Sequence, residues 1–130
     1  AFPHGTTGAG IEVISSRNVE VDGNTVEDNW QGITALDDHR GAGNNGPWTV
    51  VNLNVHHNVV RSRIDDDGAG RIGIIDMKGG GAFLPTSNNR FQQNTYSLGQ
   101  RRLYFLWMGR EMDEGEWRRF QQDVAGIFER

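Results

Sequence analysis

The densest polar cluster of the chain is Asp37-Asp38-His39-Arg40, which directly follows the apolar run 32–36. Two carboxylates beside an imidazole can transfer protons when burial moves their pKa values apart. The cluster opens a long loop, and loops on a rigid scaffold often carry catalytic and binding residues. Asp37, Asp38 and His39 are therefore candidate catalytic residues. The alternative is an ordinary solvated turn, because polar loop residues are usually exposed.

The adjacent histidines His56 and His57 form the second candidate. Strand alternation turns His56 away from the apolar Val55, so His56 joins the candidates for proton transfer. Neighbouring side chains of a strand point to opposite sides, and the pair therefore predicts a poor two-ligand metal site. We favour a structural role for the pair, at a corner of the chain.

The acidic run Asp65-Asp66-Asp67 is a candidate calcium site, because Ca²⁺ binds several carboxylate and carbonyl oxygens. Asp65 and Asp67 are the expected ligands, and Asp76, in the next apolar run, could add a third. An EF-hand loop needs alternating acids and a distant glutamate, and this run has neither. Contiguous acids repel each other, so the alternative is a solvated turn without an ion.

Two tryptophans and two arginines are candidates for binding a substrate. Trp30 and Trp48 flank expected corners of the chain, where an exposed indole offers a flat apolar face to a sugar ring. Arg61 and Arg71 lie in the central part of the chain and could neutralise a substrate carboxylate. The alternatives are core packing for the tryptophans and ordinary surface ion pairs for the arginines.

A repeat with a period of about 35 residues, typical of solenoids, must position these candidates. Asn18–Val26 aligns with Asn52–Val60 and, more loosely, with Asn88–Tyr96. Each copy carries an asparagine between two apolar residues. The three asparagines are expected to form a hydrogen-bonded ladder at one corner of the fold: Asn24, Asn58 and Asn94.

A different pattern begins at Leu103, where a continuous apolar run predicts a strand. From Asp113 to Ile127 the apolar residues have the spacing of an amphipathic helix, and Asp113 is its expected N-cap. The predicted organisation is one domain with an irregular lead-in over 1–9, stacked strands over 10–109 and a capping helix over 110–130.

The repeat copies, together with the strands expected at 32–36 and 72–75, resemble the right-handed parallel β-helix superfamily, the pectate-lyase-like fold built from PbH1-type repeats. The resemblance implies an all-β fold, a short right-handed parallel β-helix (β-solenoid) of about three to four rungs with a C-terminal α-helical cap. The segment 116–123 is similar to the closing segment of many secreted bacterial members. The superfamily hosts lyases, hydrolases, epimerases and non-enzymatic spikes, so the resemblance leaves the activity open.

The expected function is that of a secreted carbohydrate-active protein, extracellular or at the cell surface, that acts on or binds a polysaccharide. For an enzyme, the resemblance implies a polysaccharide lyase, a glycoside hydrolase or a uronate epimerase, with Ca²⁺ as the cofactor of a lyase. One alternative is a non-catalytic solenoid that is adhesive, filament-forming or structural. Another is a capping fragment of a larger enzyme.

Charge and composition exclude some classes of partner and of chemistry. The net charge of −4 gives no basic footprint for nucleic acid, and no apolar run is long enough to span a membrane. The absence of cysteine excludes a disulfide framework and thiolate chemistry.

The first strands have no apparent cap, which predicts end-to-end self-association. The start at Ala1 leads us to expect a processed or truncated chain.

Overall fold

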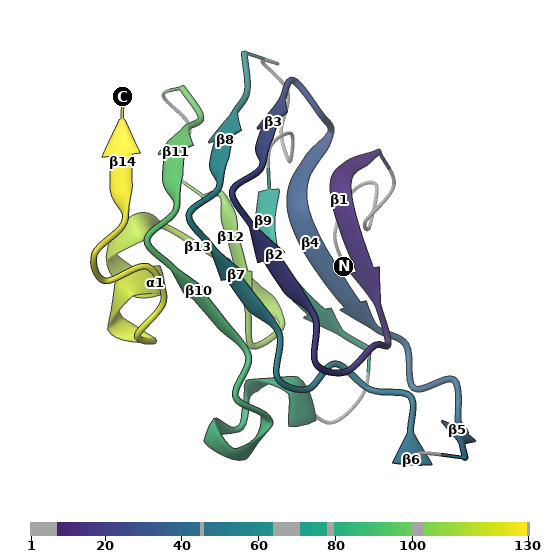
Figure 1. Ribbon diagram of the computed structural model, residues 1–130. Coiled ribbons are helices and arrows are strands. Elements are labelled where there is room, and N and C mark those ends of the chain that lie inside the picture. Colours follow the sequence, from purple (N-terminus) through teal and green to yellow (C-terminus); the bar gives the residue numbers. More distant parts are fainter. Residues whose placement is uncertain (1–7, 45, 64–70, 78–79, 100–102, 130) are drawn as a thin grey trace.

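Figure 1 shows the computed structural model of the chain, which describes residues 8–44, 46–63, 71–77, 80–99 and 103–129. Most of its regular structure is β-strand. The first sheet has the order β1 (Ala9–Ile14), β4 (Gln31–Asp37), β9 (Arg71–Asp76), β12 (Phe105–Trp107) and β13 (Arg110–Met112). Its pairs are parallel except for β12 and β13, which are antiparallel.

Two further sheets are parallel throughout. The second contains β2 (Glu20–Asp22), β7 (Asn54–His56) and β10 (Arg90–Gln92). The third contains β3 (Thr25–Glu27), β8 (Val59–Arg61), β11 (Thr95–Ser97) and β14 (Ile127–Glu129). A small antiparallel pair, β5 (Ala42–Gly43) and β6 (Gly46–Pro47), projects from the loop after β4.

The three larger sheets share one apolar core. In Figure 1 the second and third sheets lie in front, with β3, β8 and β11 continuing β2, β7 and β10, and β9 and β12 lie behind. Alternate residues of each strand point inward, because successive side chains of a strand face opposite sides. The aligned repeat positions therefore meet in the core, as the pairing of Val55 with Val21 and Phe91 shows.

The expected asparagine ladder is confirmed. Asn24 donates through Nδ2 to Asn58 Oδ1 at 3.1 Å, and Asn58 donates in the same way to Asn94 at 3.0 Å. The ladder continues to Asp123, whose Oδ1 accepts from Asn94 Nδ2 at 2.9 Å. Each acceptor oxygen also takes a backbone N–H of the preceding copy, so the ladder satisfies the backbone at this corner.

A second ladder was not predicted. Asn88 Nδ2 donates to Asn52 Oδ1 at 3.1 Å, and Asn52 Nδ2 donates to Asn18 Oδ1 at 3.0 Å. All three have positive φ, between 52° and 57°, a conformation that asparagine tolerates better than most residues. The asparagine at the start of each repeat copy was the available signal.

The expected fold class, a single β-solenoid of about three to four rungs with a C-terminal α-helical cap, is wrong. The strands fall into several parallel and mixed sheets, including the antiparallel pairs β12–β13 and β5–β6. The C-terminal segment ends in strand β14, which pairs with β11, and no helical cap is evident.

The helix expected from Asp113 to Ile127 is much shorter than the periodicity indicated. Asp113 is the N-cap as predicted, because its side chain accepts from Glu116 N at 2.9 Å, but α1 (Glu114–Arg119) has only six residues. Gln121 and Asp123 then adopt positive φ, which ends the helix. Asp123 lies there because it completes the ladder, and this tertiary bonding overrides the helical period.

Two 3₁₀ turns complete the regular structure, η1 (Gly81–Phe83) and η2 (Pro85–Ser87). None of the helices in the described part of the chain has the length and apolarity needed to cross a membrane.

Candidate acid–base site

Two buried carboxylates lie side by side where β4 and β9 end. Asp37 pairs with Asp76 in the register of these parallel strands. They follow Ala35 and Ile74 by two residues and therefore share their inward direction. Their side chains are only 3% and 1% exposed.

His39 joins this pair from the start of the following loop. Its Nε2 lies 2.5 Å from Asp76 Oδ1 and 3.6 Å from Asp37 Oδ1. The backbone of His39 is left-handed, with φ at 53°, and this turn brings the ring back to the strand ends. The side chain is 27% exposed, so His39 is the member of the cluster that reaches solvent.

Backbone amides hold both carboxylates in place. Val50 N donates to Asp37 Oδ2 at 3.0 Å, and His39 N donates to Asp37 Oδ1 at 3.3 Å. Ala82 N donates to Asp76 Oδ2 at 3.1 Å. A carboxylate oxygen held in this way can accept the Nε2–H of His39. In the neutral imidazole, Nδ1 then carries the lone pair.

This arrangement can transfer a proton through His39. The buried carboxylates fix the ring and stabilise its protonated form, as a carboxylate does for the histidine of a catalytic triad. The carboxylates themselves are shielded from solvent. Two carboxylates that flank a glycosidic bond, as hydrolysis usually requires, would both have to contact the substrate.

Asp38, the third predicted member, points to other partners. Its Oδ1 accepts from Ser15 Oγ at 2.6 Å, and both of its oxygens accept from the Arg40 guanidinium. These hydrogen bonds, from Arg40 first and then Ser15, hold the pKa of Asp38 well below its usual range. Asp38 therefore stays ionised and serves to fix Arg40 and the loop against β1.

The two candidate tryptophans lie at opposite ends of β4. Trp48 is 48% exposed, and its backbone N–H donates to Gly41 O at 2.9 Å, two residues beyond His39. Its indole covers Gly43, where an added Cβ would come within 2.5 Å of Nε1. Trp30 precedes the first residue of β4, so only Trp48 is on the side of the strand where the cluster lies.

The candidate arginines are engaged elsewhere. Arg61 is exposed and pairs with Glu27 at 3.1 Å. Arg71 is buried at the start of β9 and pairs with Glu111. Because the cluster lies at the opposite end of β9, neither arginine belongs to it.

Of the three residues predicted to bind calcium, the structure describes only Asp76. Asp65 and Asp67 lie outside the described residues. Asp76 pairs with a histidine nitrogen, whereas Ca²⁺ is bound by oxygen ligands. One oxygen or nitrogen atom from each of Asp37, His39 and Asp76 lies within 4.8 Å of the others, and this mixed set fits Zn²⁺ better than Ca²⁺.

Sequence reasoning selected Asp37 and His39 as candidates but did not predict that they lie beside Asp76. Both acids directly follow an apolar strand, Leu36 or Ile75, and that shared position was the available signal. His56, the fourth predicted catalytic residue, lies on β7 in the second sheet, beside Glu20 and Asp22, and does not join the cluster.

A cavity of about 370 Å³ lies among α1, β11, β12 and β14. Its lining combines aromatic side chains, Tyr96, Phe105 and Phe128, with charged residues that include Glu116 and Arg119. Glu116 already pairs with Arg110 at 2.7 Å. The cavity offers space for a small molecule, but the histidine–carboxylate cluster has the more specific chemistry.

No protein-family model, curated protein or solved structure matches this chain. The resemblance to pectate-lyase-like proteins therefore stays a prediction from the sequence pattern, and the site is interpreted from its geometry.

Proposed function

We propose that this protein acts on an acidic polysaccharide, with His39 as the group that takes or returns the proton. The observation that carries the proposal is the position of His39, which is partly exposed and held by the buried carboxylate of Asp76. A location outside the cell or at its surface belongs to the same proposal, because long polysaccharides are found mainly there.

Proton abstraction fits this site better than glycoside hydrolysis. A lyase or an epimerase removes the hydrogen next to the carboxyl group of a uronate, and one base can start that reaction. The charge on the resulting imidazolium is then balanced by Asp76 and Asp37. Hydrolysis would instead need both carboxylates at the sugar, and their burial prevents this.

Trp48 supports a carbohydrate substrate. Its indole is exposed on the loop that also carries the Asp37 partner Val50, and an aromatic face of this kind can pack against a sugar ring. The hydrogen bond between Trp48 N and Gly41 O keeps this loop close to the segment that follows His39.

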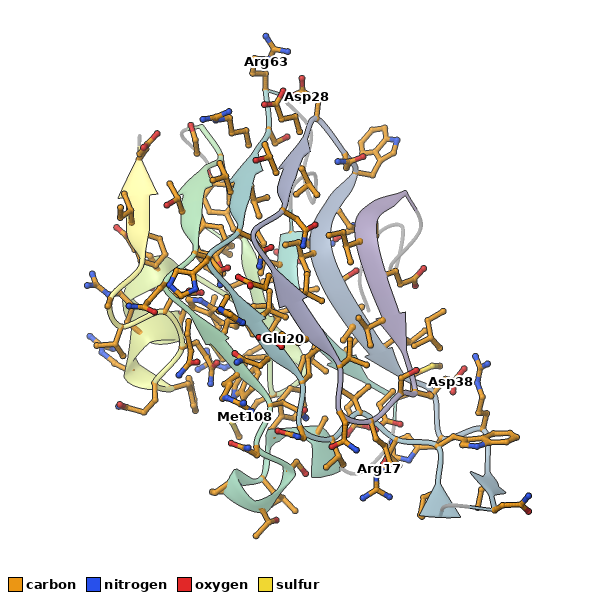
Figure 2. All side chains as sticks on the ribbon, viewed as in Figure 1. Arg17, Glu20, Asp28, Asp38, Arg63 and Met108 are labelled. Atoms are coloured by element: carbon orange, nitrogen blue, oxygen red, sulfur yellow. The ribbon has the colours of Figure 1, made fainter. Side chains whose placement is uncertain are left out.

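The test is incubation of the full chain with neutral and uronate polysaccharides, with calcium and with a chelator. New reducing ends, the ultraviolet absorbance of unsaturated uronates and the NMR signals of epimerised uronates are followed. We expect turnover of uronate substrates, and a loss of about 10²- to 10⁴-fold in kcat for His39→Gln. Asp76→Asn should lower turnover as well. Asp28→Asn is the control and should leave turnover unchanged, because Asp28 pairs with Arg63 and lies far from Asp38, the neighbour of Asp37, in Figure 2.

Two results would overturn the proposal. One is a kcat of His39→Gln that equals the kcat of the unchanged chain. The other is a complete absence of both turnover and binding with every uronate polysaccharide. Binding without turnover, abolished by Trp48→Ala, would replace the catalytic role with a glycan-binding role at the same surface.

A further inference from the structure

Four polar side chains gather on the outer face of the second sheet. Val21 and Val55 point into the core, so the residues beside them point outward. Glu20 and Asp22 lie on β2, and Asp22 is paired with His56 on β7. Glu20 is labelled in Figure 2, on the strand that lies in front.

The expectation that His56 and His57 face opposite sides is wrong. His57 has a left-handed backbone, with φ at 55°, at the corner that follows β7. This turn breaks the strand alternation and brings the two Nδ1 atoms to 2.7 Å from each other. The corresponding position in the first repeat copy is Gly23, also with positive φ, which was the signal that alternation would end here.

A carboxylate oxygen completes the convergence. Asp22 Oδ1 lies 3.3 Å from His56 Nδ1 and 3.9 Å from His57 Nδ1. A Zn²⁺ ion with ligand bonds of 2.0–2.1 Å separates tetrahedral ligand atoms by about 3.3 Å. The three atoms therefore need only a small opening of the His57 ring, whose side chain is exposed, to become ligands of one ion.

Glu20 prepares His56 for this role. Its Oε1 lies 2.5 Å from His56 Nε2, the ring nitrogen away from the cluster. A carboxylate that accepts the Nε2–H leaves the lone pair on Nδ1, and it also makes the ring a better donor to a metal. This carboxylate–histidine arrangement is the usual support of a metal-bound imidazole.

We propose that Asp22, His56 and His57 form a surface site for a late first-row divalent metal such as Zn²⁺, supported by Glu20. In the metal-free state His56 donates its Nε2–H to Glu20, so its Nδ1 has a free lone pair. His57 donates its Nδ1–H to that lone pair. When a metal binds Nδ1 of His57, the proton of that ring moves to its Nε2. Water completes the coordination.

The donor set decides the class of ion. Two imidazole nitrogens and one carboxylate suit Zn²⁺, Cu²⁺ or Ni²⁺, whereas Ca²⁺ and Mg²⁺ require oxygen ligands. The site is separate from the Asp37–His39–Asp76 cluster, which lies at the ends of strands in the first sheet. It does not depend on the proposed action on polysaccharides.

The test titrates Zn²⁺ into the full chain by calorimetry and records the visible spectrum of the Co²⁺ form, which reports the coordination geometry of the ion. We expect one ion per chain bound at this site and its loss in His57→Asn, a change that suits the left-handed backbone. Glu20→Gln should lower the affinity by about 10- to 100-fold while the three ligands remain. Gln92→Ala, beside His56 on β10, is the matched surface control and should bind as the unchanged chain does.

Circular dichroism of each variant shows whether it is folded. The proposal is overturned if the folded chain binds no Zn²⁺, or if His57→Asn binds it as tightly as the unchanged chain. It is also overturned if binding is abolished by His39→Gln rather than by His57→Asn, because the ion would then lie at the Asp37–His39–Asp76 cluster.

Discussion

At the scale of single residues, the candidate sites depend on backbone conformations that side chains seldom adopt. His39 and His57 both have left-handed backbones, and in each case the unusual φ turns an imidazole toward its partners. Such conformations cost free energy and persist only where the surrounding structure holds them. Here the strand ends and the corner hydrogen bonds hold them.

Asp123 is the residue whose protonation we expect to affect stability. Its carboxylate is buried and accepts from Asn94, Tyr96 and Trp117, with Tyr96 Oη at 2.6 Å and Trp117 Nε1 at 2.9 Å. Burial raises the pKa of Asp123 above its ordinary value of 3.8, although these hydrogen bonds oppose the rise. The folded chain therefore keeps the proton to a higher pH than the unfolded chain.

The direction in which stability changes with pH follows from the linkage between protonation of Asp123 and folding. A raised pKa in the folded state gives a stabilising contribution that is complete below the unfolded pKa and is lost as pH rises through the folded pKa. We expect Asp123→Asn to lower the free energy of unfolding by about 1–3 kcal/mol, because its amide cannot accept from Trp117 at the same atom. Urea denaturation of both chains from pH 3.5 to pH 7 should show this difference shrinking as pH rises; a difference that grows would contradict the raised pKa.

Gly73 tests the close approach of β9 and β12. Its φ is 135°, and an added Cβ would lie 2.1 Å from the backbone oxygen of Leu106. We expect Gly73→Ala to lower the free energy of unfolding by at least about 2 kcal/mol, because backbone and not a flexible side chain must move. Gly81→Ala is the control, since nothing lies within 4 Å of its added Cβ. Equal unfolding midpoints for the two variants would contradict the close approach.

At the scale of elements, the asparagine ladder should be the most sensitive corner of the fold. Asn58 is buried, accepts from Asn24 N, and donates to Val21 O as well as to Asn94. We expect Asn58→Ala to lower the free energy of unfolding by about 3 kcal/mol, because it leaves buried polar groups without partners. Thermal unfolding followed by circular dichroism measures this loss.

The second ladder supplies the control for that experiment. Asn52 lies in an exposed ladder and has φ at 56°. Asn52→Gly keeps the left-handed backbone accessible and should lower the free energy of unfolding by less than about 1 kcal/mol. If Asn58→Ala and Asn52→Gly lower the free energy of unfolding equally, burial would not be the reason for the sensitivity of Asn58.

Local patterns predicted some elements well and failed where distant contacts decide. The repeat placed Asn24, Asn58 and Asn94 at one corner because each copy carries the same local signal. The helix end could not be read from spacing, because Asp123 is fixed by partners far away in the sequence. The pairing of Asp37 with Asp76 also depends on a register shift between Gln31 and Thr34, which no local pattern shows.

At the scale of the whole molecule, the three larger sheets each begin with a strand that has a partner on one side only among the described residues. These edge strands are β1, β2 and β3, and Figure 1 shows them on the same side of the molecule, opposite β14. Unpaired strand edges offer backbone hydrogen bonds to another chain. Because the two edges of the molecule differ, contact between them would be head-to-tail and could continue from chain to chain.

We therefore expect association that increases with protein concentration. Light scattering after gel filtration, or sedimentation velocity, over a hundredfold range of concentration should show a rising average mass. Thr25→Lys, an exposed position on edge strand β3, should reduce the association, because charge on an edge opposes pairing with a second edge. Thr95→Lys, at the aligned position of the inner strand β11, is the matched control and should leave the association nearly unchanged. A chain that stays strictly monomeric at the highest concentration would show that these edges do not pair.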